Sequence, residues 1–144
     1  MQTIWTILEE AGVLNSVGTS VRVENPPFQR LLIENLAESG PDGHRAISIA
    51  HYGESNGDLM RDPEVCAEIV VDQDAPALCP YSFRTDFAGF AQVSRWRDTD
   101  GTLHCLPRET RAMEEFLLMW DRNLREQGYL EAFRRSRPAG GGGQ

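Results

Sequence analysis

Apolar residues near the two ends of the chain recur at the three- and four-residue spacing of an amphipathic helix. Between Thr3 and Leu14 the apolar stripe consists of Ile4, Ile7, Leu8, Ala11 and Leu14. After Pro107, which suits the first turn of a helix, a second stripe consists of Met113, Phe116, Leu117, Trp120 and Leu124. The pattern predicts an N-terminal helix over 3–14 and a long C-terminal helix that ends near Gly128.

The segments between these two predicted helices are short, rich in β-forming residues and separated by turn residues, which is typical of an antiparallel meander. A brief alternation over 21–24 stops at Pro26 and Pro27, because proline lacks the N–H that a sheet ladder needs. Gly53–Pro63 is interpreted as a polar connection. Five stretches are predicted as strands: Arg30–Leu36, Arg45–Tyr52, Glu64–Val71, Leu78–Phe83 and Phe87–Trp96.

Together these elements predict an α+β fold. An antiparallel sheet of four to five strands is expected, with the N-terminal helix and the long C-terminal helix packed on one face. The chain has 144 residues, which is the length of one domain. We expect residues 1–137 to form this single domain and residues 138–144 to be a disordered, glycine-rich tail.

The charge of the chain restricts its partners. It has 22 acidic residues against 14 basic ones, all of them arginine, and a formal net charge of -8. Such a surface repels phosphate backbones, so direct binding of nucleic acid is not expected, whereas basic protein partners are favoured. The sequence has no apolar run of about 18 residues and no secretory signal at its start, which predicts a cytoplasmic protein without a membrane-spanning helix.

Arginines in the C-terminal segment offer a second interpretation of the charge, in which this segment touches nucleic acid. They alternate with Glu126 and Glu131, as is typical of an ordinary solvated helix face. The arginines concerned are Arg122, Arg125, Arg134, Arg135 and Arg137.

The three cysteines do not indicate disulfides or a metal site. Cys66, Cys79 and Cys105 are odd in number and widely spaced, without a Cys-x-x-Cys pair. Cys66 lies in an apolar run and is expected to be a small buried residue. His104 next to Cys105 is a single pair of ligand types, which is too few for zinc. No metal ion or other cofactor is predicted.

The segment from His51 to Glu64 holds most of the side chains that could carry chemistry. Carboxylates gathered so closely must be solvated, paired or bound to a metal, because burying them alone is very unfavourable. The order of residues required for an EF-hand calcium loop is absent. The polar members of this segment are His51, Glu54, Asn56, Asp58, Arg61, Asp62 and Glu64.

Three interpretations of this segment remain open beside a contact surface. In a hard-cation loop, oxygen ligands for Ca²⁺ or Mg²⁺ could come from Glu54, Asn56, Asp58, Asp62 and Glu64. In a hydrolase, His51 would be the general base and Asp58 or Glu64 would orient it, and with Asp62 the group could assist a metal ion. No nucleophile elbow, phosphate loop or His-Glu-x-x-His motif accompanies these residues. In a structural role, Asn56-Gly57 would reverse a hairpin and His51 would be half-buried on a sheet face.

The same segment resembles the core of a small uncharacterised family from bacterial plasmids, phages and integrative elements. The residues that carry the resemblance run from Ile47 to Glu64 and fit the pattern His-Tyr-x-x-x-Asn-Gly-Asp-x-Met-x-Asp-Pro-Glu. A second block of that family resembles residues 80–89, Pro-Tyr-Ser-Phe-Arg-Thr-Asp-Phe-Ala-Gly. The resemblance covers roughly residues 28–97. It implies a mobile genetic element as the setting and implies no catalytic residue.

Charge and setting together favour a non-catalytic, acidic interaction module of a mobile element. Residues 54–86 contain 8 acidic residues and 2 arginines. Such a surface can compete with a phosphate backbone for a basic protein, including one that binds nucleic acid, and would serve an element against host defence. The predicted contact residues are Glu54, Asn56, Asp58, Arg61, Asp62, Glu64, Glu68, Asp72 and Asp74.

Overall fold

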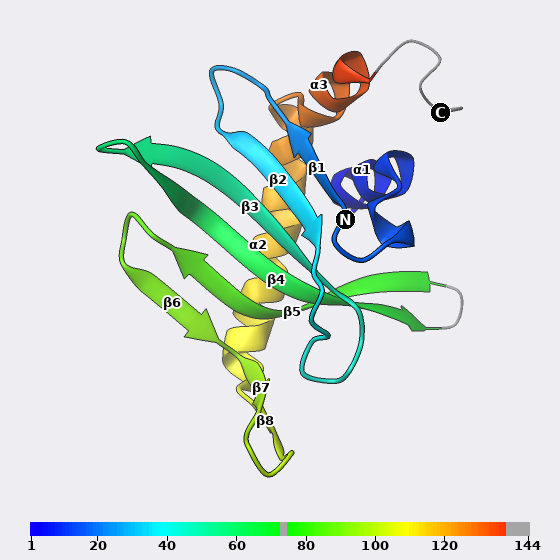
Figure 1. The fold of residues 1–144 in the computed structure, drawn as a ribbon, viewed down its shortest axis with the longest axis vertical. Helices are drawn as coiled ribbons and strands as arrows, with labels where there is room; N and C mark the ends of the chain where they lie inside the picture. Colours follow the sequence, from blue (N-terminus) through cyan, green and yellow to red (C-terminus); the bar gives the residue numbers. More distant parts are fainter. Residues whose placement is uncertain (73–74, 138–144) are drawn as a thin grey trace.

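The computed structural model describes residues 1–72 and 75–137. A six-stranded antiparallel sheet forms its centre, with the strands in the order in which they occur in the chain, and the helices lie against one face of this sheet (Figure 1). The strands of the sheet are β1 (Ser20–Val23), β2 (Arg30–Asn35), β3 (Ala46–Ser55), β4 (Asp58–Asp72), β5 (Ala75–Thr85) and β6 (Phe90–Val93). The remaining elements are α1 (Thr3–Ala11), a short 3-10 helix (Val13–Asn15), the two-stranded ribbon of β7 (Arg95–Arg97) and β8 (Leu103–Cys105), α2 (Pro107–Glu126) and α3 (Tyr129–Ser136).

The hydrophobic core lies between the sheet and the helices. Side chains alternate between the two faces of a strand, and in β2 every second residue is buried. Each such buried aliphatic side chain stabilises the fold by about 1.5–3 kcal/mol. The strands contribute Val23, Leu31, Ile33, Ile47, Ile49, Val65, Ala67 and Leu78, and the helices contribute Ile4, Ile7, Leu8, Leu117, Trp120, Leu124, Tyr129, Ala132 and Phe133.

The predicted α+β class is confirmed, as are the antiparallel sheet, the N-terminal helix and the long helix that follows the sheet. The number of strands was predicted too low. The alternation over 21–24 is a true strand, because β1 pairs with β2 from Ser20 opposite Glu34 to Val23 opposite Leu31. The stretch predicted as one strand over 87–96 is divided between β6 and β7, which belong to different sheets.

The interpretation of Gly53–Pro63 as a polar connection is wrong. β3 and β4 continue through it and pair as far as Ser55 opposite Asp58. The reversal needs only Asn56 and Gly57, whose φ angles of 52° and 85° both lie in the left-handed region. Two such residues form the tight turn that matches the twist of the flanking strands. The predicted Asn-Gly reversal is therefore confirmed, and it produces a long hairpin.

The helices start where the sequence predicts and differ at their ends. α1 stops at Ala11 because Gly12 adopts a left-handed conformation with φ 72°, so the predicted helix over 3–14 is three residues too long. α2 begins at Pro107, and Gly128, with φ 86°, separates it from α3. The predicted tail over 138–144 lies outside the described residues. Within residues 1–72 and 75–137, no helix combines the length and the apolar composition that a membrane crossing requires.

Candidate functional site

The two sequence blocks singled out above meet at the end of the sheet that carries the β3–β4 turn. The backbone N–H of Arg61 donates to Asp86 Oδ2 over 2.8 Å, and the N–H of Asp86 donates to the Arg61 carbonyl over 2.8 Å. Thr85 Oγ1 donates to Asp62 Oδ1 over 2.7 Å. Residues 61–62 and 84–86 therefore form one connected group, although more than twenty positions separate them in the chain.

Asp86 of this group and the neighbouring Glu64 already make hydrogen bonds or ion pairs within the protein. Ser48 Oγ donates to Glu64 Oε2 over 2.6 Å, and Arg61 Nε lies 3.8 Å from Glu64 Oε1. Arg84 Nε donates to Asp86 Oδ1 over 2.6 Å. The backbone N–H of Arg61 and the Arg84 guanidinium hold the pKa of Asp86 below its usual value. These contacts make Arg61, Asp62 and Glu64 parts of a packed network and reduce the charge that they present to a partner.

The turn of the β3–β4 hairpin presents free charge. Glu54, Asn56 and Asp58 are exposed, and neither carboxylate makes an ion pair with any residue that the structure describes. Apolar side chains accompany them, since Leu59 and Phe87 are 60% and 48% exposed. We define the hairpin tip as residues 54–59. It combines an exposed apolar side chain with two carboxylates that make no ion pair with the residues that the structure describes.

Glu68 was predicted as a surface contact, and this prediction is wrong. Its side chain is fully buried, and Oε1 lies 2.8 Å from Nη1 of Arg95. Oε2 accepts the backbone N–H groups of Asp42 and His44 over 2.9 and 3.1 Å. A Cβ atom at Gly40 would lie 2.1 Å from Glu68 Cγ, which shows how closely the β2–β3 loop covers it. Alternation correctly places Glu68 opposite the core face, but that loop and β7 exclude water from it.

Asp72, another of the predicted contact residues, lies at the other end of β4. The backbone of Asp72 closes the β4–β5 hairpin opposite Ala75. Asp74 lies outside the described residues. The nine predicted contacts therefore do not form one continuous surface among the residues described, because Glu54, Asn56 and Asp58 lie at one end of β4 and Asp72 at the other.

His51, Asp58 and Glu64, the group suggested for hydrolysis, are not brought together. His51 lies on the helix-covered face, with its ring 5.2 Å from the Trp120 ring and 5.4 Å from the Tyr129 ring, centroid to centroid. Glu64 bonds to Ser48, whose neighbours Ile47 and Ile49 point to the core, so the pair lies on the opposite face. Asp58 lies at the exposed tip. The sheet itself separates the proposed base from Glu64.

The environment of His51 matches the structural interpretation of this residue. Burial lowers the pKa of His51, against the raising effects of the Arg30 carbonyl, 3.4 Å from Nδ1, and of the Asp62 charge.

Within the described residues, no three His, Cys, Asp or Glu side chains are placed to hold a metal ion. Burial also raises the pKa of the Cys66 thiol, which disfavours the nucleophilic thiolate.

We expect the neutral state of His51 to make stability depend on pH. The pKa of His51 in the folded protein lies below its ordinary value of 6.5, so the unfolded chain takes up a proton first as pH falls. Stability is therefore complete above the unfolded pKa and is lost as pH falls toward the folded pKa. Urea unfolding between about pH 8 and about pH 5 should show a smaller loss for His51→Gln than for the unmodified protein. Parallel pH profiles for the two proteins would contradict this.

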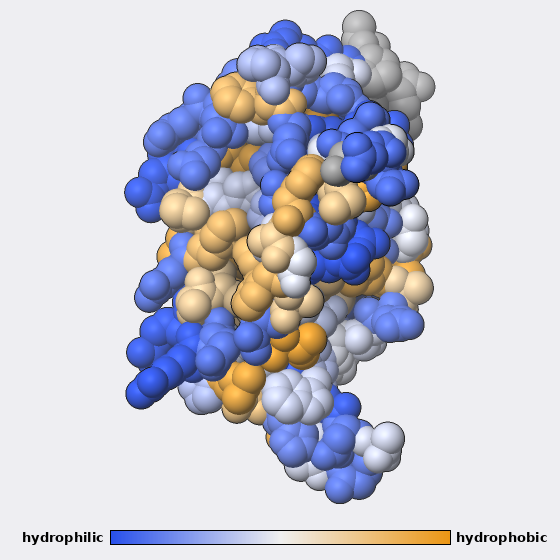
Figure 2. All heavy atoms as spheres, turned by 90° about the vertical axis from the view of Figure 1, so that its left-hand side faces the viewer, coloured by the Kyte–Doolittle hydropathy of each residue, from blue (hydrophilic) through white to orange (hydrophobic). Residues whose placement is uncertain are grey.

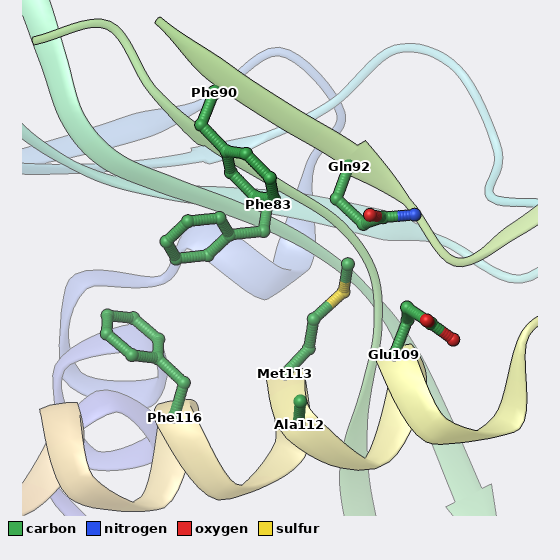
Figure 3. Close-up of a pocket in the computed structure, with 7 residues that line it drawn as sticks. All are labelled: Phe83, Phe90, Gln92, Glu109, Ala112, Met113 and Phe116. Atoms are coloured by element: carbon green, nitrogen blue, oxygen red, sulfur yellow. The ribbon is translucent and has the colours of Figure 1, made fainter. Parts of the chain in front are cut away.

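A cavity that the sequence did not predict opens between β5, β6 and α2. Its volume is about 260 Å³, and it has an apolar part formed by aromatic rings and a methionine and a polar end formed by Gln92 and Glu109 (Figure 3). The lining residues are Phe83, Phe90, Gln92, Glu109, Ala112, Met113 and Phe116. The helical spacing of apolar residues predicted that Met113 and Phe116 would be buried. It could not show that a cavity would remain between this helix and the strands facing it.

The side of the molecule that carries β6 is apolar beyond this cavity. Figure 2 looks onto that side and shows hydrophobic residues gathered across its middle, with hydrophilic residues around them. On β6 and the loop before it, Phe87, Phe90 and Val93 are each 48–49% exposed. Contiguous exposed apolar surface of this kind marks sites of interaction in soluble proteins.

Comparisons with known proteins identify a family and give no activity. Neither a curated protein nor a solved structure matches this chain. The family model described as "Domain of unknown function (DUF6908)" matches residues 2–130, which includes α1, the whole sheet and α2. Because this match spans most of the chain, the protein belongs to the DUF6908 family.

Proposed function

We propose that the protein is a non-catalytic interaction module that presents its hairpin tip to a basic protein. The proposal is carried by the carboxylates of Glu54 and Asp58, which are exposed and have no ion-pair partner in the described part of the chain. Hydrogen bonds hold their hairpin to the end of β5 and the loop after it, since Arg61 bonds to Asp86 and Asp62 to Thr85. A pre-ordered surface loses little conformational entropy when it binds.

The setting that we propose is the cytoplasm of a bacterium that carries a plasmid, phage or integrative element. A protein with a net charge of -8 attracts basic surfaces at a distance and repels nucleic acid. A basic partner that itself binds nucleic acid would be blocked by an acidic competitor, and a mobile element would gain protection from host defence in this way. The resemblance of residues 47–64 and 80–89 to mobile-element proteins supports this setting.

Reversing the charge of the hairpin tip tests the proposal. Glu54→Arg combined with Asp58→Arg should reduce capture of a basic partner from host lysate by about tenfold or more, because like charges then face each other. Capture by the unmodified protein should also fall between about 50 mM and about 500 mM salt, since salt screens exposed charges. Mass spectrometry of the captured proteins measures both effects.

A matched control changes the same charge elsewhere. Glu9→Arg combined with Glu126→Arg alters two exposed carboxylates on α1 and α2, and leaves the hairpin unchanged. This control should still capture the partner. If the hairpin variant and the control capture the same basic protein equally well, the hairpin tip is not the contact surface and the proposal is wrong.

A further inference from the structure

β6 is the outermost strand of the sheet, and no strand among the described residues pairs with its outer edge. The N–H of Ser94 donates to the Tyr81 carbonyl over 2.8 Å. Hydrogen-bonded pairs alternate along an antiparallel ladder, so Phe90 and Gln92 direct their backbone groups to β5. The N–H and carbonyl groups of Ala91 and Val93 consequently face outward, where a further strand can bond to them. The Val93 carbonyl accepts a hydrogen bond from Gln92 Nε2 over 3.2 Å, which an added strand would replace.

The side chains of β6 place the cavity beside this open edge. Phe90 and Gln92 line the cavity, and Val93 points to the opposite face of the sheet. An added strand would direct every second side chain toward the cavity mouth. At about 260 Å³ the cavity is smaller than the roughly 300–1,000 Å³ typical of small-molecule sites and has the size of a side chain.

The polar end of the cavity and the nearby charges define what fits. Glu109 makes no ion pair with any described residue, and its carboxylate lies at the same end of the cavity as the Gln92 amide (Figure 3). The apolar part lies between the rings of Phe83, Phe90 and Phe116. A net charge of -8 opposes pairing with a second copy of the chain and favours a cationic segment.

We propose that the β6 edge binds an extended, basic segment of another protein by strand addition. The bound segment places a large apolar side chain among the phenylalanine rings. Two positions away, on the same face of the added strand, a Lys or Arg side chain reaches Glu109. The spacing follows from the two-residue period of a strand, which separates such side chains by about 6.6 Å. The inference rests on the proposed function for the basic character of the partner.

The test is selection of displayed random twelve-residue peptides on the folded, full-length protein, followed by affinity measurement with a synthetic form of the selected peptide. The expected consensus is a large apolar residue and a Lys or Arg in the pattern apolar-x-basic. N-methylation of the peptide backbone at alternate positions should abolish binding, because it removes the N–H groups that bond to Ala91 and Val93. This measurement does not depend on any change to the protein.

Three variants of the protein test the three parts of the site. Ala112→Phe fills the cavity from an exposed position, Ala91→Pro removes an outward N–H, and Glu109→Gln removes the charge. The first two should each weaken the peptide at least about tenfold. Glu109→Gln should weaken only peptides that retain the basic residue. Asn123→Phe adds the same ring at an exposed position of α2 outside the cavity and should bind normally.

Three outcomes overturn the inference, and a fourth leaves it standing without the proposed contact at the hairpin tip. If selection on the unmodified protein enriches no peptide relative to selection on Ala112→Phe, the cavity has no such ligand. A dimer in light scattering that Ala91→Pro converts to a monomer would assign the edge to a second copy of the chain. If the tip variants lose the basic partner and Ala112→Phe retains it, the proposed function holds and this inference fails. If Ala112→Phe loses the partner and the tip variants retain it, the partner binds at the β6 edge and the hairpin tip is not its contact surface.

Discussion

Glu68→Ala is expected to lower the free energy of unfolding by about 3–5 kcal/mol, because it removes the buried partner of Arg95 and leaves that charge only the partly exposed Asp42. Arg95 is 8% exposed, and its Nη1 lies 2.8 Å from Glu68 Oε1. The backbone N–H groups of Asp42 and His44 also lose their acceptor. The effect should appear as a lower midpoint in urea unfolding, together with faster hydrogen exchange in the β2–β3 loop.

The partly exposed partner of the same arginine provides the control. Asp42 Oδ2 lies 3.0 Å from Arg95 Nη1, and the Asp42 side chain is 39% exposed. Solvent screens this pair, so Asp42→Ala should cost about 1 kcal/mol or less. If Glu68→Ala unfolds at the same urea concentration as Asp42→Ala, the buried pair does not hold the loop and the interpretation of Glu68 is wrong.

Asp121→Ala is expected to cost about 2–3 kcal/mol, because Asp121 caps a helix that has no cap of its own. Gln2, at the start of α1, makes no capping bond with its side chain. Instead the Asp121 carboxylate, on α2, accepts the backbone N–H groups of Gln2, Thr3 and Ile4 over 3.0, 3.2 and 2.8 Å. A negative charge here also complements the positive end of the helix dipole.

Two measurements distinguish loss of the cap from a general loss of stability. In Asp121→Ala, amide exchange should increase within α1 more than in the strands of the core. Glu126→Ala, at an exposed position of α2, the helix that carries Asp121, should change the free energy of unfolding by about 0.5 kcal/mol or less. If Asp121→Ala increases amide exchange by the same factor in α1 and in the core strands, α1 does not depend on this carboxylate.

The elements that the sequence predicted best are those whose signal is local. The α2 stripe of Met113, Leu117, Trp120 and Leu124 is buried as its period requires. The Asn56-Gly57 reversal occurs where two residues with positive φ were expected. The error at Gly53–Pro63 arose because polar residues were interpreted as a loop. In a long hairpin the backbone pairing continues beyond the core, and exposed polar side chains are compatible with it.

The candidate site was predicted only in part, because charge along a chain does not show which charges are paired. Glu54 and Asp58 are exposed as expected, whereas Glu64 bonds to Ser48 and Glu68 is buried against Arg95. The partner of Glu68 lies 27 positions away on another sheet, and no spacing rule connects the two. The cavity beside β6 depends in the same way on how α2 is placed over β5 and β6.

By itself the sequence determined the α+β class, the two terminal helices, the antiparallel meander and the acidic character of the chain, because each follows from local period, turn chemistry or composition. Tertiary structure alone decided which carboxylates remain free, that Asp121 caps α1, that the sheet separates His51 from Glu64, and that an open edge lies beside an apolar cavity. The physical reason is that burial and pairing depend on segments distant in the chain, whose approach is set by the packing of the whole core.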